Sequence, residues 1–341
     1  MEGELAAALS QAVQSVLAAE GAGLVPVFEK APRSLAQRVS AEVLGKLQRR
    51  YKRENLLQAF TGRAWLQLPG AFLVDDLPET PTDFLPVPDC HTTLRARLAM
   101  LGVHEILGKE TIAYRSESDG GLFVNLVARP GQGRLAEKST KGMRGHTDAV
   151  SFPFPGTADP DFPRIAPSPD LVTLAGLKNP NSIPTHIVPL PEILTRLKPE
   201  DIAELEKAQF IIQCQETFRA GTEAILGTQH MLSDAPVLHA ATDGSMSVRF
   251  SHSKVVAEHD NAAATRAREA FIAACAEAVI PVPAIPGSIL LINNRKALHG
   301  RSPVGDGHGA NTRWLLRTYA LAEEAIHPRS RYRDSAYQLF P

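Results

Sequence analysis

Apolar residues recur every three to four positions at the start of the chain, and this spacing predicts amphipathic helices. The stripe of the first helix, within the first 20 residues, comprises Leu5, Leu9, Val13, Val16 and Leu17. The same spacing follows Pro32 and predicts a second helix over residues 35–47. Both stripes are typical of helices that pack on a core, so neither indicates a functional surface.

Short apolar runs separated by turn residues predict strands in the rest of the chain. The expected strands are residues 65–77, 121–128, 171–177, 185–188, 287–298 and 312–321. Helical periodicity returns at residues 92–107, 191–210 and 261–279, and residues 246–256 alternate as in a strand or an ordered lid. Proline-rich residues 151–170 and glycine-rich residues 300–311 predict loops. Helices followed by scattered strands favour a β-sandwich or barrel braced by helices over a parallel βαβ sheet.

Composition excludes several classes of protein. The 341 residues are 44% apolar and 21% charged, as in an ordinary globular protein. With 36 Lys and Arg against 37 Asp and Glu, the chain offers no basic surface to nucleic acid. No apolar run is long enough to span a membrane, and the acidic N-terminus is unlike a signal peptide. Three widely spaced cysteines form no disulfide or zinc pattern, so we expect a cytoplasmic protein.

The chain contains one triplet with metal-binding spacing, within Gly145-His146-Thr147-Asp148. Nucleotide-binding glycine motifs, the GxSxG nucleophile motif and the HExxH zinc motif are absent from the sequence. In an extended strand His146 and Asp148 point to the same face, so they can bind one metal ion. With 11 histidines and 37 acidic residues, about one such triplet is expected by chance, so the motif alone favours a structural histidine.

A second segment changes this interpretation. Residues 289–301 predict a strand that places His299 before a turn, and Arg313 and Arg317 follow 14 and 18 residues later. Arg313 and Arg317 share one face of the last strand; inside a barrel they would need anionic partners. Two histidines and one carboxylate are the ligand set of a facial triad, which leaves positions open on Fe(II).

Taken together, Gly-His-Thr-Asp, the Asn-Asn-Arg-x-x-Leu-His-Gly-Arg segment and Arg-Trp-Leu-x-Arg resemble the Fe(II)/2-oxoglutarate-dependent oxygenases. The chain is most similar to the clavaminate synthase-like amino-acid hydroxylases, which are related to taurine dioxygenase. Clavaminate-type enzymes usually have Glu as the acidic ligand, whereas Asp148 matches the taurine dioxygenase pattern. The resemblance spans residues 65–321 and keeps the family's order and spacing.

The resemblance implies a role for each matching residue. His146, Asp148 and His299 would bind Fe(II), Arg313 and Thr185 would bind 2-oxoglutarate, and Arg317 would bind the substrate carboxylate. Ser251, His252 and Ser253 occupy the lid segment where arginine hydroxylases carry acidic residues, so a polar or neutral substrate side chain is expected. The alternative for Arg317 is a structural ion pair with an acid of the lid, such as Asp243 or Glu258.

The resemblance also implies the fold and the reaction. We expect one domain (residues 1–341) that is mainly β, with a double-stranded β-helix, or jelly-roll, core and flanking helices. Its parts would be N-terminal helices (1–60), the core (61–190 and 286–322), a helical lid insert (191–285) and a C-terminal tail (323–341). With Fe(II), 2-oxoglutarate and O2, the enzyme would hydroxylate a C–H bond of a free L-amino acid or a close derivative and release succinate and CO2.

Other activities stay open at this point. Desaturation would use the same oxygenase chemistry, whereas halogenases replace the acidic ligand, which Asp148 retains. A cupin-like isomerase or hydrolase, or a metal-binding protein without catalysis, could use the same three ligands. An isomerase of that kind would not need Arg313.

Overall fold

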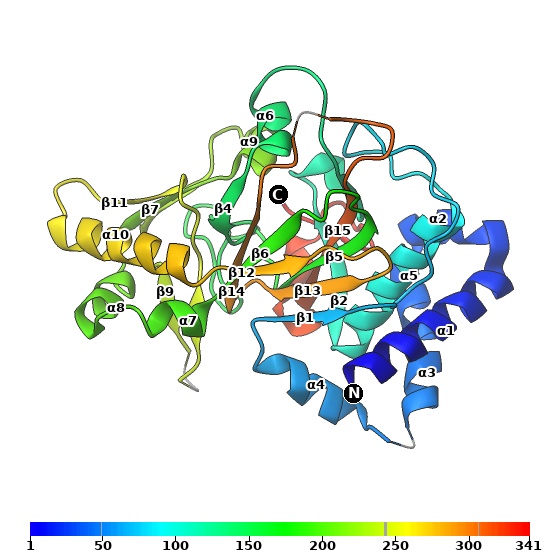
Figure 1. The fold of residues 1–341 in the computed structure, drawn as a ribbon. Helices are drawn as coiled ribbons and strands as arrows, with labels where there is room; N and C mark the ends of the chain where they lie inside the picture. The colour runs from blue at the N-terminus through cyan, green and yellow to red at the C-terminus, as the bar shows by residue number, and fades with distance from the viewer. Residues whose placement is uncertain (49, 242–243, 306) are drawn as a thin grey trace.

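The computed structural model describes residues 1–48, 50–241, 244–305 and 307–341, and it contains two large sheets (Figure 1). The larger sheet has the strand order β1-β13-β5-β15-β2-β16, with β3 also paired to β15. Its strands are β1 (Trp65–Leu68), β2 (Lys109–Tyr114), β3 (Val124–Leu126), β5 (Leu171–Lys178), β13 (Ile289–Asn293), β15 (Trp314–Ala322) and β16 (Gln338–Leu339). The smaller sheet, ordered β12-β6-β14-β4, comprises β4 (Met143–His146), β6 (Pro184–Pro189), β12 (Ile280–Pro283) and β14 (Ala297–Arg301).

The central strands of the larger sheet are buried on both faces. Along β5, Val172 and Leu174 point to one face while Leu171 and Ala175 point to the other, as the two-residue period of a strand requires. The first face shares an apolar core with residues of the smaller sheet, such as Ile187. The two sheets therefore pack face to face as a sandwich, and the site described below lies at one end of it.

Helices of the N-terminal segment cover the opposite face of the larger sheet (Figure 1). They are α1 (Glu2–Glu20), α2 (Leu24–Lys30), α3 (Pro32–Leu47), α4 (Arg53–Thr61) and α5 (His91–Ile106), with a short 3-10 turn at Gly21–Gly23. Helices α3 and α5 cross closely at Gly102, where an added Cβ would lie 2.3 Å from Cγ1 of Val39. The expected stripes of α1 and α3 are buried here, which confirms both helices.

The segment between β6 and β12 forms a separate layer on the other side of the sandwich (Figure 1). Its helices are α7 (Leu190–Leu194), α8 (Pro199–Leu205), α9 (Glu216–Leu226) and α10 (Ala262–Glu277). Its strands are β7 (Phe210–Gln213), β8 (Met231–Ala235), β9 (Leu238–Ala240), β10 (Met246–Val248) and β11 (Val255–Ala257). Val150, Val188 and Leu298 join this layer to the sandwich through a shared apolar cluster. The insert therefore contains both helices and strands, and the sequence pattern indicated a strand there only at residues 246–256.

Other element predictions need correction. The strand expected at residues 65–77 ends at Leu68, and the helix expected at 191–210 is divided into α7 and α8. The single strand expected at 287–298 is two strands, β13 and β14, which lie in different sheets and are joined by a turn at residues 294–296. Helix α6 (Arg134–Thr140) was not predicted, because two nearby glycines indicated a loop. Among the described residues, no helix is both long and apolar enough to cross a bilayer.

Candidate active site

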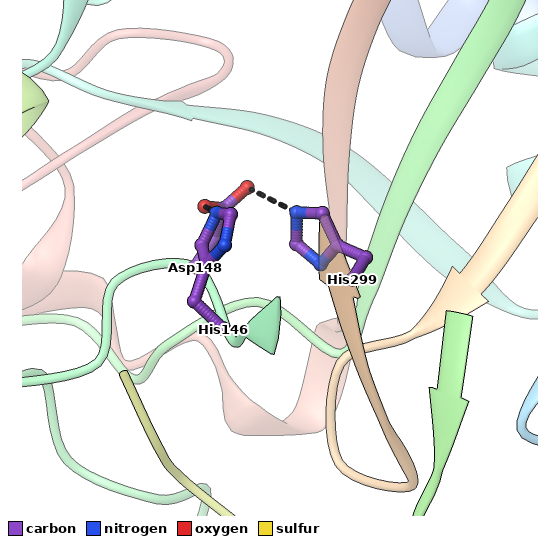
Figure 2. A group of neighbouring side chains, drawn as sticks. All are labelled: His146, Asp148 and His299. Atoms are coloured by element: carbon purple, nitrogen blue, oxygen red, sulfur yellow. Dashed lines mark ion pairs between the residues drawn. The ribbon is translucent and has the colours of Figure 1, made fainter. Parts of the chain in front are cut away.

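Two neighbouring strands of the smaller sheet bring the three expected metal ligands together (Figure 2). His146 ends β4 and is paired across the ladder with His299 of β14, and Asp148 follows two residues after His146. The close approach of β4 and β14 needs Gly300, where an added Cβ would lie 2.3 Å from the carbonyl oxygen of Met143. The register of the two strands thus places residues 153 positions apart in sequence in one cluster.

The three side chains are buried and face a common point. Asp148 Oδ1 lies 3.5 Å from Nε2 of His146, and Asp148 Oδ2 lies 3.6 Å from Nε2 of His299. One potential ligand atom from each of the three residues lies within 4.8 Å of the others. This donor set, two imidazoles and one carboxylate, suits Fe(II) and leaves other coordination positions open.

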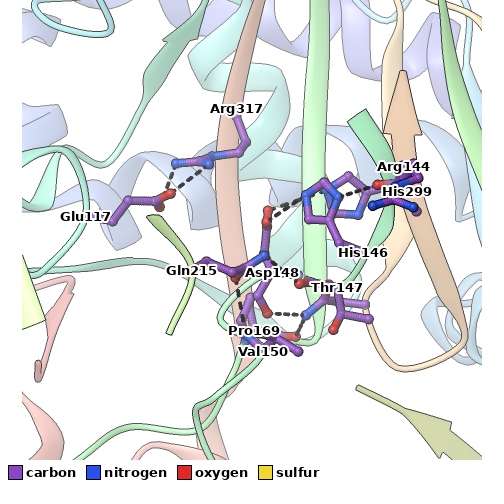
Figure 3. A network of polar contacts seen from close by, with 12 residues as sticks. Glu117, Arg144, His146, Thr147, Asp148, Val150, Pro169, Gln215, His299 and Arg317 are labelled. Atoms are coloured by element: carbon purple, nitrogen blue, oxygen red, sulfur yellow. Dashed lines mark hydrogen bonds and ion pairs between the residues drawn. The ribbon is translucent and has the colours of Figure 1, made fainter. Parts of the chain in front are cut away.

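Hydrogen bonds hold the cluster in place (Figure 3). Nδ1 of His146 lies 3.1 Å from the carbonyl oxygen of Arg144; when it donates this bond, Nε2 keeps its lone pair for a metal. Asn294 accepts from the backbone N–H of Asp148 at 2.9 Å and donates to its carbonyl at 3.1 Å. Gln215 of the insert bonds Thr147 and Val150 in the same way. The loop after β4 is therefore fixed from two sides.

The protonation states also suit a divalent cation. Burial and the neighbouring His299 lower the pKa of His146 from its ordinary value of 6.5, so the neutral form is favoured. Burial alone would raise the pKa of Asp148, but the two histidines hold it well below its usual range. A neutral imidazole beside an ionised carboxylate is the state in which these groups bind metal.

The cluster opens into a cavity of about 320 Å³ between the two sheets. Thr185, Arg301, Arg313 and Arg317 line this cavity together with the three candidate ligands. Thr185 stands opposite Arg301 in the β6–β14 ladder, so the smaller sheet places a hydroxyl and a guanidinium side by side. The six residues that were expected to bind iron, 2-oxoglutarate or the substrate carboxylate therefore all line one cavity.

Arg313 lacks a carboxylate partner among the described residues. Burial, together with the nearby Arg301, lowers the pKa of Arg313 to about 9. Nε of Arg313 and Oγ1 of Thr185 are both buried without a hydrogen-bond partner in the part of the chain described. Buried polar groups of this kind are rare unless a ligand satisfies them, so this end of the cavity suits an anion.

Arg317 has the opposite environment (Figure 3). Its two terminal nitrogens donate to both carboxylate oxygens of Glu117 at 3.0 and 2.7 Å. Burial opposes the charged guanidinium, but the negative charge of Glu117 raises the pKa of Arg317 above its ordinary value. The hydroxyl of Tyr319 lies 3.0 Å from Glu117 and 3.1 Å from Asp148, and so connects the ion pair to the candidate metal ligands.

The sequence analysis missed Glu117. It lies in a polar Ser-Glu-Ser-Asp turn after β2, which resembles an exposed loop, and nothing in the pattern marks it as buried. Of the two lid acids considered for Arg317, Asp243 lies outside the described residues and Glu258 is not its partner.

The expected lid residues line a second cavity of about 240 Å³, adjacent to the first. Ser251 bridges the backbone of His146, and Nδ1 of His252 lies 2.7 Å from the carbonyl oxygen of Gly145. Ser253 lines the same cavity, whereas none of the three serine and histidine side chains lines the cavity with Arg313. The two cavities share Lys138, Met143 and His146, so they meet beside a candidate metal ligand.

Comparison with known proteins supports an oxygenase. Residues 169–319 match the family described as taurine catabolism dioxygenase TauD, TfdA family. The chain is 26% identical over 280 residues to an L-lysine 3-hydroxylase of Catenulispora acidiphila, covering 80% of this chain and 70% of that protein.

Solved structures share the fold over almost the whole chain. An asparagine oxygenase in complex with Fe(II), 3-hydroxyasparagine and succinate has a TM-score of 0.76 at 17% identity, covering 99% of this chain and 97% of the other. The non-heme iron oxygenase OrfP with Fe, succinate and (3S)-hydroxy-L-Arg has a TM-score of 0.75 at 20% identity, covering 98% and 97%. These matches confirm the resemblance found in the sequence: the chain is similar to the TauD, TfdA dioxygenases over residues 169–319, and it is a non-haem iron, 2-oxoglutarate-dependent oxygenase.

Proposed function

We propose that the protein hydroxylates an unactivated C–H bond of a free L-amino acid, with 2-oxoglutarate and O2 consumed and succinate and CO2 released. The observation that carries this proposal is the buried His146–Asp148–His299 cluster in one cavity with the guanidinium of Arg313, which has no carboxylate partner in the described part of the chain. The two-sheet sandwich would then be a jelly roll, with the metal at its open end. The curated and structural relatives whose names state a substrate act on amino acids, which supports this substrate class.

In this proposal His146, Asp148 and His299 bind Fe(II), which supplies, with 2-oxoglutarate and O2, the oxidation that replaces a C–H bond by C–OH. Arg313 binds the distal carboxylate of 2-oxoglutarate as a bidentate pair, and the hydroxyl of Thr185 donates to it. These contacts would satisfy the buried atoms that lack partners in the protein alone. Arg301 adds positive charge to the same end of the cavity.

Arg317 and Glu117 suit the head group of an amino acid. A zwitterion carries a carboxylate and an ammonium next to each other, and the Arg317–Glu117 pair offers the complementary charges next to each other. We expect Arg317 to bind the α-carboxylate, with Glu117 available to accept from the ammonium. Since Tyr319 links Glu117 to Asp148, the head group would be held at a fixed position relative to the metal.

The experiment is a screen of free L-amino acids for succinate formation in the presence of Fe(II), 2-oxoglutarate and O2. An oxygenase forms succinate and a hydroxylated product in equal amounts with its substrate. A cupin-like isomerase would form no succinate, and a desaturase would form succinate with a product lighter by two hydrogens, which mass spectrometry separates.

The carboxylate contact is tested with the α-amide of whichever amino acid is turned over. Wild-type enzyme should reject the amide, and Arg317→Met should lose most of this preference. Equal turnover of acid and amide by the wild type would show that Arg317 does not bind a free α-carboxylate.

A further inference from the structure

The second cavity carries an excess of positive charge that the expected function leaves unexplained. Its charged lining residues are Lys138, Arg144, Glu216 and Lys254, and its neutral polar ones are Gln215, Ser251, His252 and Ser253. Glu216, the one carboxylate among these lining residues, already lies 3.3 Å from Arg134 and 3.9 Å from Lys254. The negative charge of Glu216 is therefore shared among neighbouring cations, and the cavity stays positive.

Lys138 is the group in this cavity that most needs an anion. It lies on α6 at the junction of the two cavities, and its side chain is half-buried. Within the described part of the chain its ammonium has no ion pair or hydrogen bond, whereas Lys141, which directly follows this helix, pairs with Glu137 at 2.8 Å. Burial lowers the pKa of Lys138, and the charges of Asp148 and Glu117 oppose that shift from beyond ion-pair distance.

The position of Lys138 relates it to a substrate side chain. The two cavities meet at Lys138, Met143 and His146, so a molecule held by its head group at Arg317 can extend past His146 into the second cavity. Its far end would then meet the ammonium of Lys138, the ammonium of Lys254 and the hydroxyls of Ser251 and Ser253. A cationic side chain would be repelled here, and an apolar one would leave these polar groups without partners.

We propose that the second cavity is the side-chain pocket of the enzyme, that it accepts an acidic amino acid, and that Lys138 is the residue that selects the side-chain carboxylate. This inference rests on the proposed function, and it separates the protein from the relative named for lysine and from OrfP, which was solved in complex with hydroxy-L-Arg. In this inference Lys138 contacts the side-chain carboxylate and not the reacting bond, so it determines specificity and takes no part in the oxidation.

The test compares three forms of one amino acid: L-glutamate, its side-chain amide glutamine and its α-amide isoglutamine, with the corresponding aspartate series run in parallel. Wild-type enzyme should prefer the acid over the side-chain amide by kcat/KM. In Lys138→Met, that preference should fall by about 10- to 100-fold, the usual range for a charge-assisted pair. The preference for the acid over the α-amide should stay, because Arg317 sets it.

Three controls make the result specific. Lys141→Met removes the lysine that directly follows the same helix and lines neither cavity, so it should match the wild type. Lys138→Arg keeps the charge and should restore most of the discrimination between acid and side-chain amide. Calorimetric titration of L-glutamate into the anaerobic protein with Fe(II) and 2-oxoglutarate measures binding without turnover, and Lys138→Met should weaken it by the same factor.

Several results would overturn the inference. One is a preference for lysine or arginine over glutamate and aspartate in the wild type. Another is an unchanged ratio of acid to side-chain amide in Lys138→Met. A rise in the KM for 2-oxoglutarate without a change in amino-acid selectivity would assign Lys138 to the cosubstrate instead. Absence of succinate with every amino acid would contradict the proposed function itself, and calorimetric binding of L-glutamate would still support the acidic pocket.

Discussion

Two arginines four residues apart line the same cavity, and the protein compensates their charges in different ways. Arg317 is paired through both terminal nitrogens with the buried Glu117, whereas Arg313 has no carboxylate partner among the described residues and lies near a second guanidinium, that of Arg301. Removing one partner of a buried ion pair destabilises the folded state, because the other charge is left buried and uncompensated. A charge left without a partner makes folding less favourable and gains its partner when a ligand binds. Substitutions at the Arg317–Glu117 pair should therefore change the stability of the fold, whereas substitutions at Arg313 should change ligand binding.

The largest effect is expected at the metal cluster, which lines the same cavity as the two arginines. His299→Ala removes one of three ligands, so iron content and turnover should both fall, with activity reduced by at least about a thousandfold. His259→Ala is the matched control, because this histidine is 93% exposed and lies outside the site. Wild-type iron content and activity in His299→Ala would show that the three residues are not the metal site.

The second effect tests the buried ion pair of Arg317 with Glu117. Glu117→Ala leaves the guanidinium of Arg317 buried without its partner, which should lower the free energy of unfolding by about 3–5 kcal/mol. Urea denaturation of the metal-free protein measures it. Glu137→Ala, which breaks the exposed pair with Lys141, should leave the unfolding curve unchanged. The double variant Glu117→Ala/Arg317→Met should recover much of the loss, and no recovery would mean that Glu117 stabilises the fold through another contact.

The third effect tests Arg313, where we expect weaker binding of 2-oxoglutarate without a loss of stability. Arg313→Leu should raise the KM for 2-oxoglutarate by about 10- to 100-fold, because one bidentate pair with the cosubstrate is lost. Iron binding should stay, because Arg313 is not a ligand in the proposed site. The same substitution should leave the metal-free protein as stable as the wild type or more stable. A large loss of stability would mean that Arg313, like Arg317, forms an ion pair within the protein that stabilises the fold.

This contrast also separates what the sequence predicted from what it could not. His299 lies on β14, Arg313 directly precedes β15 and Arg317 lies on β15, so the two-residue period of a strand predicts that the two arginines share a face. The structure brings together His146, Asp148 and His299 as the motif implied. The β-sandwich or barrel was also predictable from local sequence pattern, because its strands are apolar on a two-residue period or are buried on both faces.

Glu117 and Lys138 could not be found in this way, because their importance depends on tertiary contacts. Glu117 lies in a polar turn and is buried only because the chain brings that turn against β15. Lys138 lies on a seven-residue helix whose sequence is mostly polar. It lines both cavities, whereas Lys141, directly after this helix, lines neither, and this difference arises from how the helix packs. A charge pattern cannot distinguish a solvated lysine from one that lines a pocket.

The smallest effect concerns a buried titratable side chain, that of His104, which the folded protein keeps neutral. His104 of α5 is fully buried beneath the larger sheet, where Nδ1 lies 2.9 Å from Oγ1 of Thr111 and Nε2 lies 2.7 Å from Oγ1 of Thr173. Burial lowers the pKa of His104 from 6.5 to about 3 in the folded protein. Below pH 6.5 the unfolded chain therefore binds a proton that the folded protein does not bind.

The sign of this difference gives the pH dependence of stability. His104 should cost no stability above pH 6.5, and between pH 6.5 and 3 it should lower the free energy of unfolding by about 1.4 kcal/mol per pH unit. His104→Gln keeps polar atoms near both threonines but cannot titrate, so its unfolding free energy should fall less steeply with acidification. Urea denaturation of both metal-free proteins at pH 7 and pH 5.5 measures the difference in slope, in which the contributions of the remaining histidines cancel. Equal slopes would mean that His104 is protonated in the folded protein at pH 5.5, and that the sheet accommodates a buried charge there without an acidic partner.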